Sequence, residues 1–296
     1  MQRCLVLGLL TLAASRATHA QIIPEALLSF PTQTESVEYD NLAVLRALPN
    51  YDGLQQEFSS KPLDHAKAAL AKLGIPESQV NELVVGTSPG TLYGLVAGTF
   101  TGSLAAKAAI KKGILPLRLE TAKMFCPDTG TCLVFLEDDI AAFGTPGELR
   151  SMLQARQGSI GSLSLNHVLV RLFNNTDSSA PVRGVASGTR LDASLTTELL
   201  NKTGSQINWT QFSSGISIFA YSVSLDTKAH VAATLECKSS FAAGLLKQTL
   251  SLIANAQALA IKAGQDPEKM PFQNLEVSSS DAVIDVKMDT RIPSAT

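Results

Sequence analysis

The sequence predicts an α+β fold of two related modules, each a mainly antiparallel sheet covered by helices. Three observations predict it. Short runs that alternate apolar and polar residues, such as Ile216 to Val223, are typical of antiparallel strands with one wetter face. Longer runs with apolar residues at helical spacing lie between them. Each half also reads as strand, helix, hairpin, helix, hairpin, beginning at Val37 in the first half and at Val182 in the second.

The first twenty residues have the composition of a secretory signal peptide. A basic start is followed by the apolar run Cys4 to Ala14, and small residues lead up to Ala20. The alternative, a retained N-terminal anchor, is disfavoured because Arg16 and His19 end the apolar run before the roughly 20 residues that a membrane span requires. We therefore expect cleavage after Ala20 and an exported, periplasmic or extracellular protein.

This leader sets the expected domain boundaries. Residues 1–20 form the signal peptide, 21–174 the first module, 175–290 the second module, and 291–296 a flexible tail. The boundary between the modules falls at the polar loop from Asn174 to Ala180.

Charge and composition exclude several kinds of partner. The formal net charge is −2, and removing the two leader arginines makes it about −4, too balanced to attract nucleic acid. Aromatic residues make up only 5% of the chain, which argues against a base- or sugar-stacking surface. Every apolar run after residue 20 is interrupted by polar or charged residues, so we expect no transmembrane segment in the mature chain.

The cysteines point to an oxidising compartment. Cys126 and Cys132 flank a turn of Pro, Asp and Gly between two strand-like runs, which predicts a disulfide across a hairpin. A redox-active site needs two intervening residues at a helix start, and that spacing is absent here. Cys237 is left over, and we expect it to be buried.

Helices are predicted from apolar spacing and end signals. Thr145-Pro146-Gly147-Glu148 is the sharpest of these, because it combines a capping box with proline at the first helical position. In the longest helix, apolar residues recur at helical spacing and predict the face that packs on a sheet: Phe241, Leu245, Leu252, Ala256 and Leu259. The expected helices are Leu42 to Phe58, interrupted at Pro49, then, after a break around Pro62, Leu63 to Leu73, and further Leu104 to Lys112, Leu149 to Gln157, Leu163 to Phe173 and Phe241 to Ala263.

Strands are predicted where short apolar or alternating runs lie between turn residues. They are Val37 to Tyr39, Leu83 to Thr87, Leu92 to Phe100, Arg118 to Phe125, Leu133 to Leu136, Ala141 to Phe143, Val182 to Ala186, Ile207 to Phe212, Ile216 to Leu225, His230 to Glu236, Glu276 to Ser278 and Ala282 to Met288.

One local match between the halves supports an internal duplication. The strand Val96 to Phe100 is followed by Leu104-Ala105-Ala106, and the strand Val231 to Leu235 is followed by Phe241-Ala242-Ala243. In both copies a strand leads into a helix whose first turn carries one large apolar residue and two alanines, a composition suited to close helix-on-sheet packing.

The segments Phe30 to Tyr39, Leu45 to Pro49 and Pro181 to Ala186, with the strand-helix junctions, resemble exported bacterial proteins, notably those of soil acidobacteria, that have tandem α/β modules. The resemblance covers most of the mature chain. It implies export and duplication, and because that group has no established activity, it implies no site residues.

One motif suggests an enzyme. Gly86-Thr87-Ser88-Pro89-Gly90 matches the G-x-S-x-G pattern in which a strand-to-helix turn exposes a nucleophilic serine. A serine hydrolase would use Ser88 with a histidine base, His167 or His230, and an acid such as Asp138 or Asp139. The competing interpretation is a hairpin turn, because Pro89-Gly90 is an ordinary turn dipeptide and a strand is predicted to follow it.

Metal and cofactor motifs are missing. The histidines lack other ligands at metal-binding spacing, and the acidic cluster Glu137-Asp138-Asp139 lacks the pattern of a calcium loop, so it is expected to be a solvated turn. No glycine pattern forms a phosphate-binding loop. We therefore expect neither a metal nor a cofactor.

The sequence thus favours an exported, non-enzymatic binding or structural protein of the cell envelope, with an envelope or extracellular ligand that it does not name. Trp209 and Tyr221 are candidates to line a site in a groove between the modules, because pockets favour domain interfaces. The alternative is the serine hydrolase. A third possibility is self-association through an exposed sheet edge.

Overall fold

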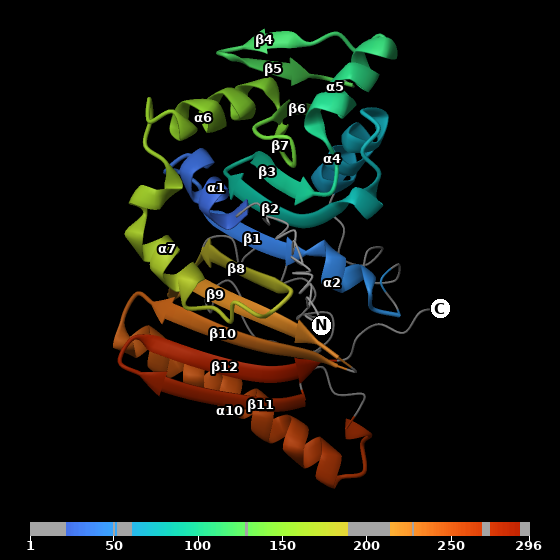
Figure 1. Ribbon diagram of the computed structural model, residues 1–296. Coiled ribbons are helices and arrows are strands. Elements are labelled where there is room, and N and C mark those ends of the chain that lie inside the picture. Colours follow the sequence, from blue (N-terminus) through green and yellow to red (C-terminus); the bar gives the residue numbers. More distant parts are fainter. Residues whose placement is uncertain are drawn as a thin grey trace, which may run out of the picture.

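The computed structural model describes residues 22–49, 51, 61–127, 130–188, 214–226, 228–267 and 273–290. In this part of the chain, one twelve-stranded antiparallel sheet runs in the order β11-β12-β10-β9-β8-β1-β2-β3-β7-β6-β5-β4 (Figure 1). Helices lie on both of its faces, so the predicted α+β class is confirmed.

The strands are β1 (Ser36–Asn41), β2 (Val80–Ser88), β3 (Thr91–Gly98), β4 (Leu117–Leu119), β5 (Ala122–Phe125), β6 (Cys132–Phe135), β7 (Ile140–Gly144), β8 (Val182–Ser187), β9 (Ile216–Leu225), β10 (Ala229–Cys237), β11 (Gln273–Ser280) and β12 (Val283–Thr290). The α-helices are α1 (Ile22–Ser29), α2 (Leu42–Arg46), α4 (Lys61–Lys72), α5 (Gly102–Lys111), α6 (Pro146–Arg156), α7 (His167–Asn174) and α10 (Ser240–Lys262), with 3-10 turns η1 (Glu77–Gln79) and η2 (Leu163–Leu165).

The two halves of the chain share this sheet at its middle. β1 pairs with β2 on one side and with β8 on the other, both antiparallel, with Val37 opposite Gly86 and Val185. On one side of the β1–β8 pair the order is β1-β2-β3-β7-β6-β5-β4, and on the other it is β8-β9-β10-β12-β11. The sheet is therefore continuous across the expected domain boundary.

One face of the sheet is covered by α1, α6 and α7. Its core includes Phe30 after α1, Leu149 of α6 and Phe173 of α7, all fully buried on inward residues of β1, β3 and β8. The predicted capping box of α6 is present: the Thr145 hydroxyl accepts from the Glu148 amide, and the Glu148 carboxylate accepts from the Thr145 amide.

The opposite face carries α4 and α5 over β2, β3 and β6, and α10 over β10, β11 and β12. α4 and α5 contribute small and branched side chains to the core on this face, including Ala69, Leu73 and Ala109. Figure 1 shows α10 against β11 and β12 and α4 and α5 beside the other half of the sheet. The strands between these two helical layers are β1, β8 and β9.

α10 is correctly predicted in extent, but its packing face was predicted wrongly. Ser239 caps its start by accepting the Ala242 amide at 3.1 Å, and Gly264 with φ +93° follows its end. The buried residues are Ala243 and Leu246.

The leucines and phenylalanine expected to pack instead face outward. Phe241 is 75% exposed, Leu252 68% and Leu259 66%. The sheet is met by the adjacent stripe of the same helix, which carries smaller side chains.

Two other predictions need correction. The single strand expected over Arg118 to Phe125 is a hairpin, β4 and β5, because Glu120 adopts φ 51° and turns the chain. The single helix expected over Leu163 to Phe173 is η2 followed by α7, since the Asn166 side chain caps a new helix by accepting the Leu169 amide at 3.2 Å.

Further differences lie at the first half's edges. α2 ends at Arg46, just before the interruption predicted at Pro49, and α1 was not predicted. Residues 52–60 and the expected strand Ile207 to Phe212 lie outside the described residues, as do the leader and the tail 291–296. No helix in the described ranges is both long enough and apolar enough to cross a membrane.

The disulfide is confirmed. Cys126 directly follows β5, Cys132 begins β6, and their Cα atoms are 4.1 Å apart in the bonded pair. Cys237 at the end of β10 is a buried free thiol, as expected, and burial raises its pKa.

Candidate functional site

Polar side chains gather where the two halves of the sheet meet, between the layers of α4 and α5 on one side and α10 on the other. The strand register places Glu38 of β1 opposite Gly184 of β8, and Gly184 opposite Tyr221 of β9. Residues that face each other in register point to the same side of a sheet. We call Glu38, Asp40 and Tyr221, with Gly184 beneath them, the junction face.

Gly184 allows Tyr221 to reach Glu38 across β8. A Cβ at this position would lie 2.7 Å from the Tyr221 hydroxyl and ring, so the absence of a side chain lets the tyrosine lie flat across β8. The Tyr221 hydroxyl thereby reaches β1 and donates to a carboxylate oxygen of Glu38. Phe219 stacks beside the tyrosine ring, with centroids 6.0 Å apart, and fixes it from the other side.

The electrostatics of the junction face raise the pKa values of its acids. The half-buried position of Asp40 and then the nearby Glu38 carboxylate raise the pKa of Asp40 well above its usual value, while Lys67 acts in the opposite direction. Partial burial and the Glu38 carboxylate likewise raise the pKa of Tyr221. A cationic group placed against these side chains would relieve the repulsion between the two carboxylates.

The opposite face of the same strands carries the positively charged side chain of Arg183. Arg183 of β8 lies between two aromatic rings, with its guanidinium carbon 5.2 Å from the Tyr39 centroid and 5.0 Å from the Phe173 centroid. Its buried Nε atom has no hydrogen-bond partner among the described residues, and burial lowers the pKa of the guanidinium. Tyr39 in turn donates its hydroxyl to Glu82 at 2.7 Å. This arrangement packs α7 against the junction and leaves the acidic side facing outward.

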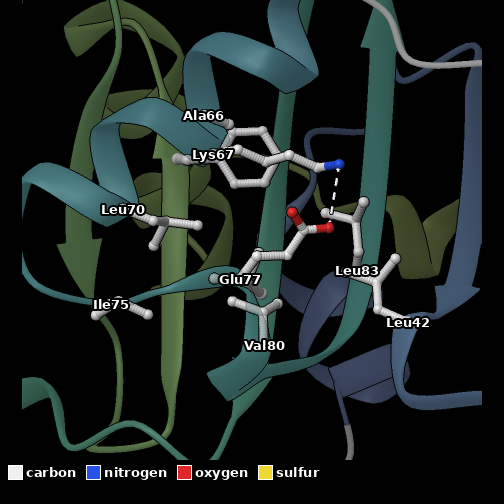
Figure 2. Close-up of a pocket in the computed structure, with 10 residues that line it drawn as sticks. Leu42, Ala66, Lys67, Leu70, Ile75, Glu77, Val80 and Leu83 are labelled. Atoms are coloured by element: carbon white, nitrogen blue, oxygen red, sulfur yellow. Dashed lines mark ion pairs between the residues drawn. The ribbon is translucent and has the colours of Figure 1, made fainter. Parts of the chain in front are cut away.

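A small cavity under α4 is a second candidate, and Figure 2 shows it between α4, η1 and β2. Apolar side chains such as Leu70, Ile75 and Val80 line it, and Lys67 and Glu77 form an ion pair of 3.3 Å between Nζ and Oε1. Its volume is about 20 Å³, room for roughly one water molecule. The cavity is a packing defect in the core and is too small for a ligand.

The serine motif has a different local structure from a nucleophile elbow. Ser88 ends β2, Gly90 turns the chain with φ +74°, and β3 begins at Thr91, so the motif lies in a hairpin. The Ser88 hydroxyl donates to the Gln33 carbonyl at 3.2 Å and lies 3.2 Å from the Tyr93 hydroxyl. One of the histidines named with it, His230, lies on β10 and is bonded to other residues.

His230 sits between two carboxylates at the β10–β12 ladder. Its Nδ1 is 2.7 Å from Asp289 Oδ1, and its Nε2 is 3.1 Å from Asp226 Oδ1. The hydrogen bond to Asp289 and, to a lesser extent, the one to Asp226 raise the pKa of His230 above 6.5. The imidazole lies on the exposed surface.

We expect NMR titration to place the pKa of His230 above 6.5, and D289N to bring it down toward that value. Because the folded pKa is the higher one, the pair stabilises the fold at pH below the unfolded pKa, and this contribution is lost as the pH rises through the folded pKa. D281N, in the β11–β12 turn, is the control and should leave the titration unchanged. An unshifted His230 would contradict the geometry.

The other residues singled out in the sequence have structural roles or lie elsewhere. Asp138, in the acidic cluster, accepts the Ser103 amide at 2.8 Å and so caps α5. Trp209 lies outside the described residues. In the described part of the chain, no three His, Cys, Asp or Glu side chains approach closely enough to hold a metal ion.

Sequence reasoning found Tyr221 but missed Glu38 and Arg183. A signal for Glu38 was present, because β1 reads Ser-Val-Glu-Tyr-Asp, with every second residue polar. Such alternation in a strand buried at the centre of a sheet marks one face that is not covered by an apolar helix layer.

Comparisons with known proteins give the fold and no family. No family model matches the chain, and no curated protein matches it. Among solved structures, TP0453 in crystal form I has a TM-score of 0.52 at 9% identity, covering 91% of this chain and 93% of that one. TP0453 in crystal form III has a TM-score of 0.51 at 9% identity, covering 90% and 94%. At this identity the likeness concerns the fold, and it extends over nearly the whole of both chains.

Proposed function

We propose that the chain is exported and acts in the cell envelope as a binding or structural protein, not as an enzyme. The disulfide between Cys126 and Cys132 carries the proposal. Disulfides persist in oxidising compartments and are rare where thiol reductants dominate. The leader-like composition of residues 1–20 supports the same compartment.

The binding role is supported by the junction face. Glu38 is exposed and Asp40 and Tyr221 are half-buried, in the middle of a sheet face whose two ends are covered by apolar helix packing. Carboxylates and a tyrosine hydroxyl at the same place offer acceptors and one donor to a polar or cationic group. The small cavity under α4, by contrast, offers no room for a substrate.

We also propose that the two halves are related modules. Their connectivity supports this: β1, β2, β3, α5, β6 and β7 in the first half follow the same order along the chain and across the sheet as β8, β9, β10, α10, β11 and β12 in the second. On this scheme the hairpin of β4 and β5 is an addition to the first half. The locally similar segments before and after residues 100 and 236 fall at the two equivalent strand-helix junctions, β3–α5 and β10–α10.

Export is tested by expressing the full chain in a bacterial host with a secretory pathway. We expect the protein in the periplasm or medium with Gln21 at its N-terminus, and alkylation before and after reduction should reveal one disulfide and one thiol, Cys237. A variant lacking residues 2–20 is the control and should stay in the cytoplasm with all its thiols reduced.

Two results would overturn the proposal. An uncleaved chain that remains in the cytoplasm would refute export. Labelling of the exported protein by a fluorophosphonate, lost in the Ser88→Ala variant, would instead show an activated serine and refute the non-enzymatic role.

A further inference from the structure

α10 presents an outward stripe of side chains along its whole length. We call it the outer stripe, and its members are all exposed: Phe241, Leu245, Gln248, Leu252, Asn255, Leu259 and Lys262. The other side of the helix packs on the sheet through Ala243 and Leu246. Four of these seven members are large apolar residues, so α10 exposes a second, partly apolar face although it is already docked on the sheet.

The spacing of the outer stripe is that of helices that pair with each other. Its members follow one another in steps of four and three, and Leu245, Leu252 and Leu259 are spaced by seven. A repeat of 3.5 residues keeps one seam facing a partner helix, with leucine at equivalent positions. Amphipathic packing on a globular core needs no such strict repeat.

The surface of α10 also carries a hollow near the start of the helix. An open depression is lined by Phe241, Gly244, Leu245 and Gln248, with Ser240 at its end. Positions i, i+3, i+4 and i+7 are the four residues that surround an inserted side chain in knobs-into-holes packing. A Cβ on Gly244 would meet no atom within 4 Å, so this glycine serves no packing within the chain and leaves the hollow open.

We propose that the outer stripe binds the outer stripe of a second copy of this chain, with the two α10 helices antiparallel and the two-fold axis near Leu252. In this arrangement, Leu259 of the second copy enters the hollow at Gly244. Leu252 of the second copy enters the four residues around Leu252 itself, and Leu245 enters those around Leu259. One register thus fills three holes at once, as an isologous interface requires.

The polar members of the stripe fit the antiparallel direction. Lys262 of one copy lies near Phe241 of the other, over an aromatic ring, whereas parallel helices would place the two Lys262 side chains together. Gln248 and Asn255 lie beside the central leucine, where amides from the two copies can hydrogen-bond to one another.

The amount of apolar surface fits a dimer. The four large apolar members leave on the order of 400 Å² of contiguous apolar surface, at the level of the largest patch on a typical monomer. A standard interface takes about 800 Å² from each partner, of which somewhat more than half is apolar. The outer stripe supplies the apolar part, and neighbouring polar residues of α10 supply a rim.

A lipid surface fits this helix less well. An interfacial membrane helix has a charged face opposite its apolar one, whereas the opposite face of α10 is packed on the sheet. Hydrocarbon would also leave the side-chain amides of Gln248 and Asn255 unsatisfied.

The proposal is tested by measuring the mass of the protein in solution by light scattering, for the wild type and for variants that place a charge at Leu252, next to the two-fold axis. We expect the purified protein to be a dimer, and Leu252→Glu and Leu252→Lys each to weaken dimerisation by about 100-fold or more. A 1:1 mixture of the two variants should recover the dimer, because the axis brings the opposite charges together. Leu104→Glu, on the exposed side of α5, is the matched control and should remain dimeric. Circular dichroism verifies that each variant is folded.

Cysteine cross-linking tests the direction of the helices. Oxidation of Leu252→Cys should give a covalent dimer, while Leu245→Cys should not, since the two equivalent positions lie about 20 Å apart along antiparallel helices. Four outcomes would overturn the proposal. The first is a monomeric wild-type protein, including one that sediments with phosphatidylcholine–phosphatidylglycerol vesicles, and the second is a dimer unaffected by charge at residue 252, which would indicate another surface such as a sheet edge. The third is a mixture of the two charge variants that stays monomeric, and the fourth is a covalent dimer formed through a cysteine at residue 245.

Discussion

Replacing Phe30 by alanine is expected to lower the free energy of unfolding by about 3–5 kcal/mol, measured by denaturant titration. Phe30 follows α1, is fully buried, and packs edge-to-face on Tyr93 with ring centroids 5.2 Å apart. Its ring also covers Gly86 in β2, where a Cβ would lie 2.8 Å from it. The change would therefore leave a cavity between α1 and the sheet that neighbouring side chains cannot fill without moving the backbone.

The matched control is Leu28→Ala in the same segment. Leu28 is 50% exposed, so its loss removes little buried surface and should cost less than about 1 kcal/mol. Equal effects of the two changes would show that α1 is not held to the sheet through Phe30.

The second large effect is expected from Gly98→Val. A Cβ at this position would lie 1.8 Å from the Gln79 carbonyl oxygen, a backbone atom that cannot rotate away. Gly98 pairs with Val80 at the point where the β2–β3 register shifts, so the clash strikes a backbone irregularity that joins η1 to the sheet. We expect a loss of about 3 kcal/mol or more, seen as a fall in the denaturation midpoint.

Gly147→Ala, at the start of α6, controls for the loss of a glycine as such. The nearest atom to its added Cβ would be 4.0 Å away, so this change should alter the stability by less than about 1 kcal/mol. A Gly98→Val protein as stable as this control would mean that β2 and β3 pair in a different register.

Elements with strong local signals were predictable from the sequence. The capping box at Thr145, the alternation in β9 and the Cys126–Cys132 disulfide all lie where they were expected. Each is determined by residues close together in the chain, where propensity and turn chemistry act directly. Boundaries set by one unusual backbone angle, such as that of Glu120, carry no such signal.

The candidate site was harder to predict because it depends on contacts across the chain. Glu38 and Tyr221 meet only because β8 pairs with β1 and because Gly184 has no side chain. Tyr221 was named as an aromatic residue near a junction, but its partner lies in the opposite half. The prediction of which face of α10 packs on the sheet was wrong for a related reason. The helix has apolar residues on two faces, and periodicity alone does not say which one meets the sheet.

The pairing of β1 with β8 has a consequence for how the chain reaches its native state. Val37 and Val185 are neighbours across two adjacent strands although most of the first half separates them along the chain. Contacts between such distant segments form late, because the entropy cost of closing a long loop must be met before the contacts stabilise the chain. A chain that folds as it is made, N-terminus first, would therefore carry β1 with one unpaired edge until β8 arrived, and would be most open to aggregation during that interval.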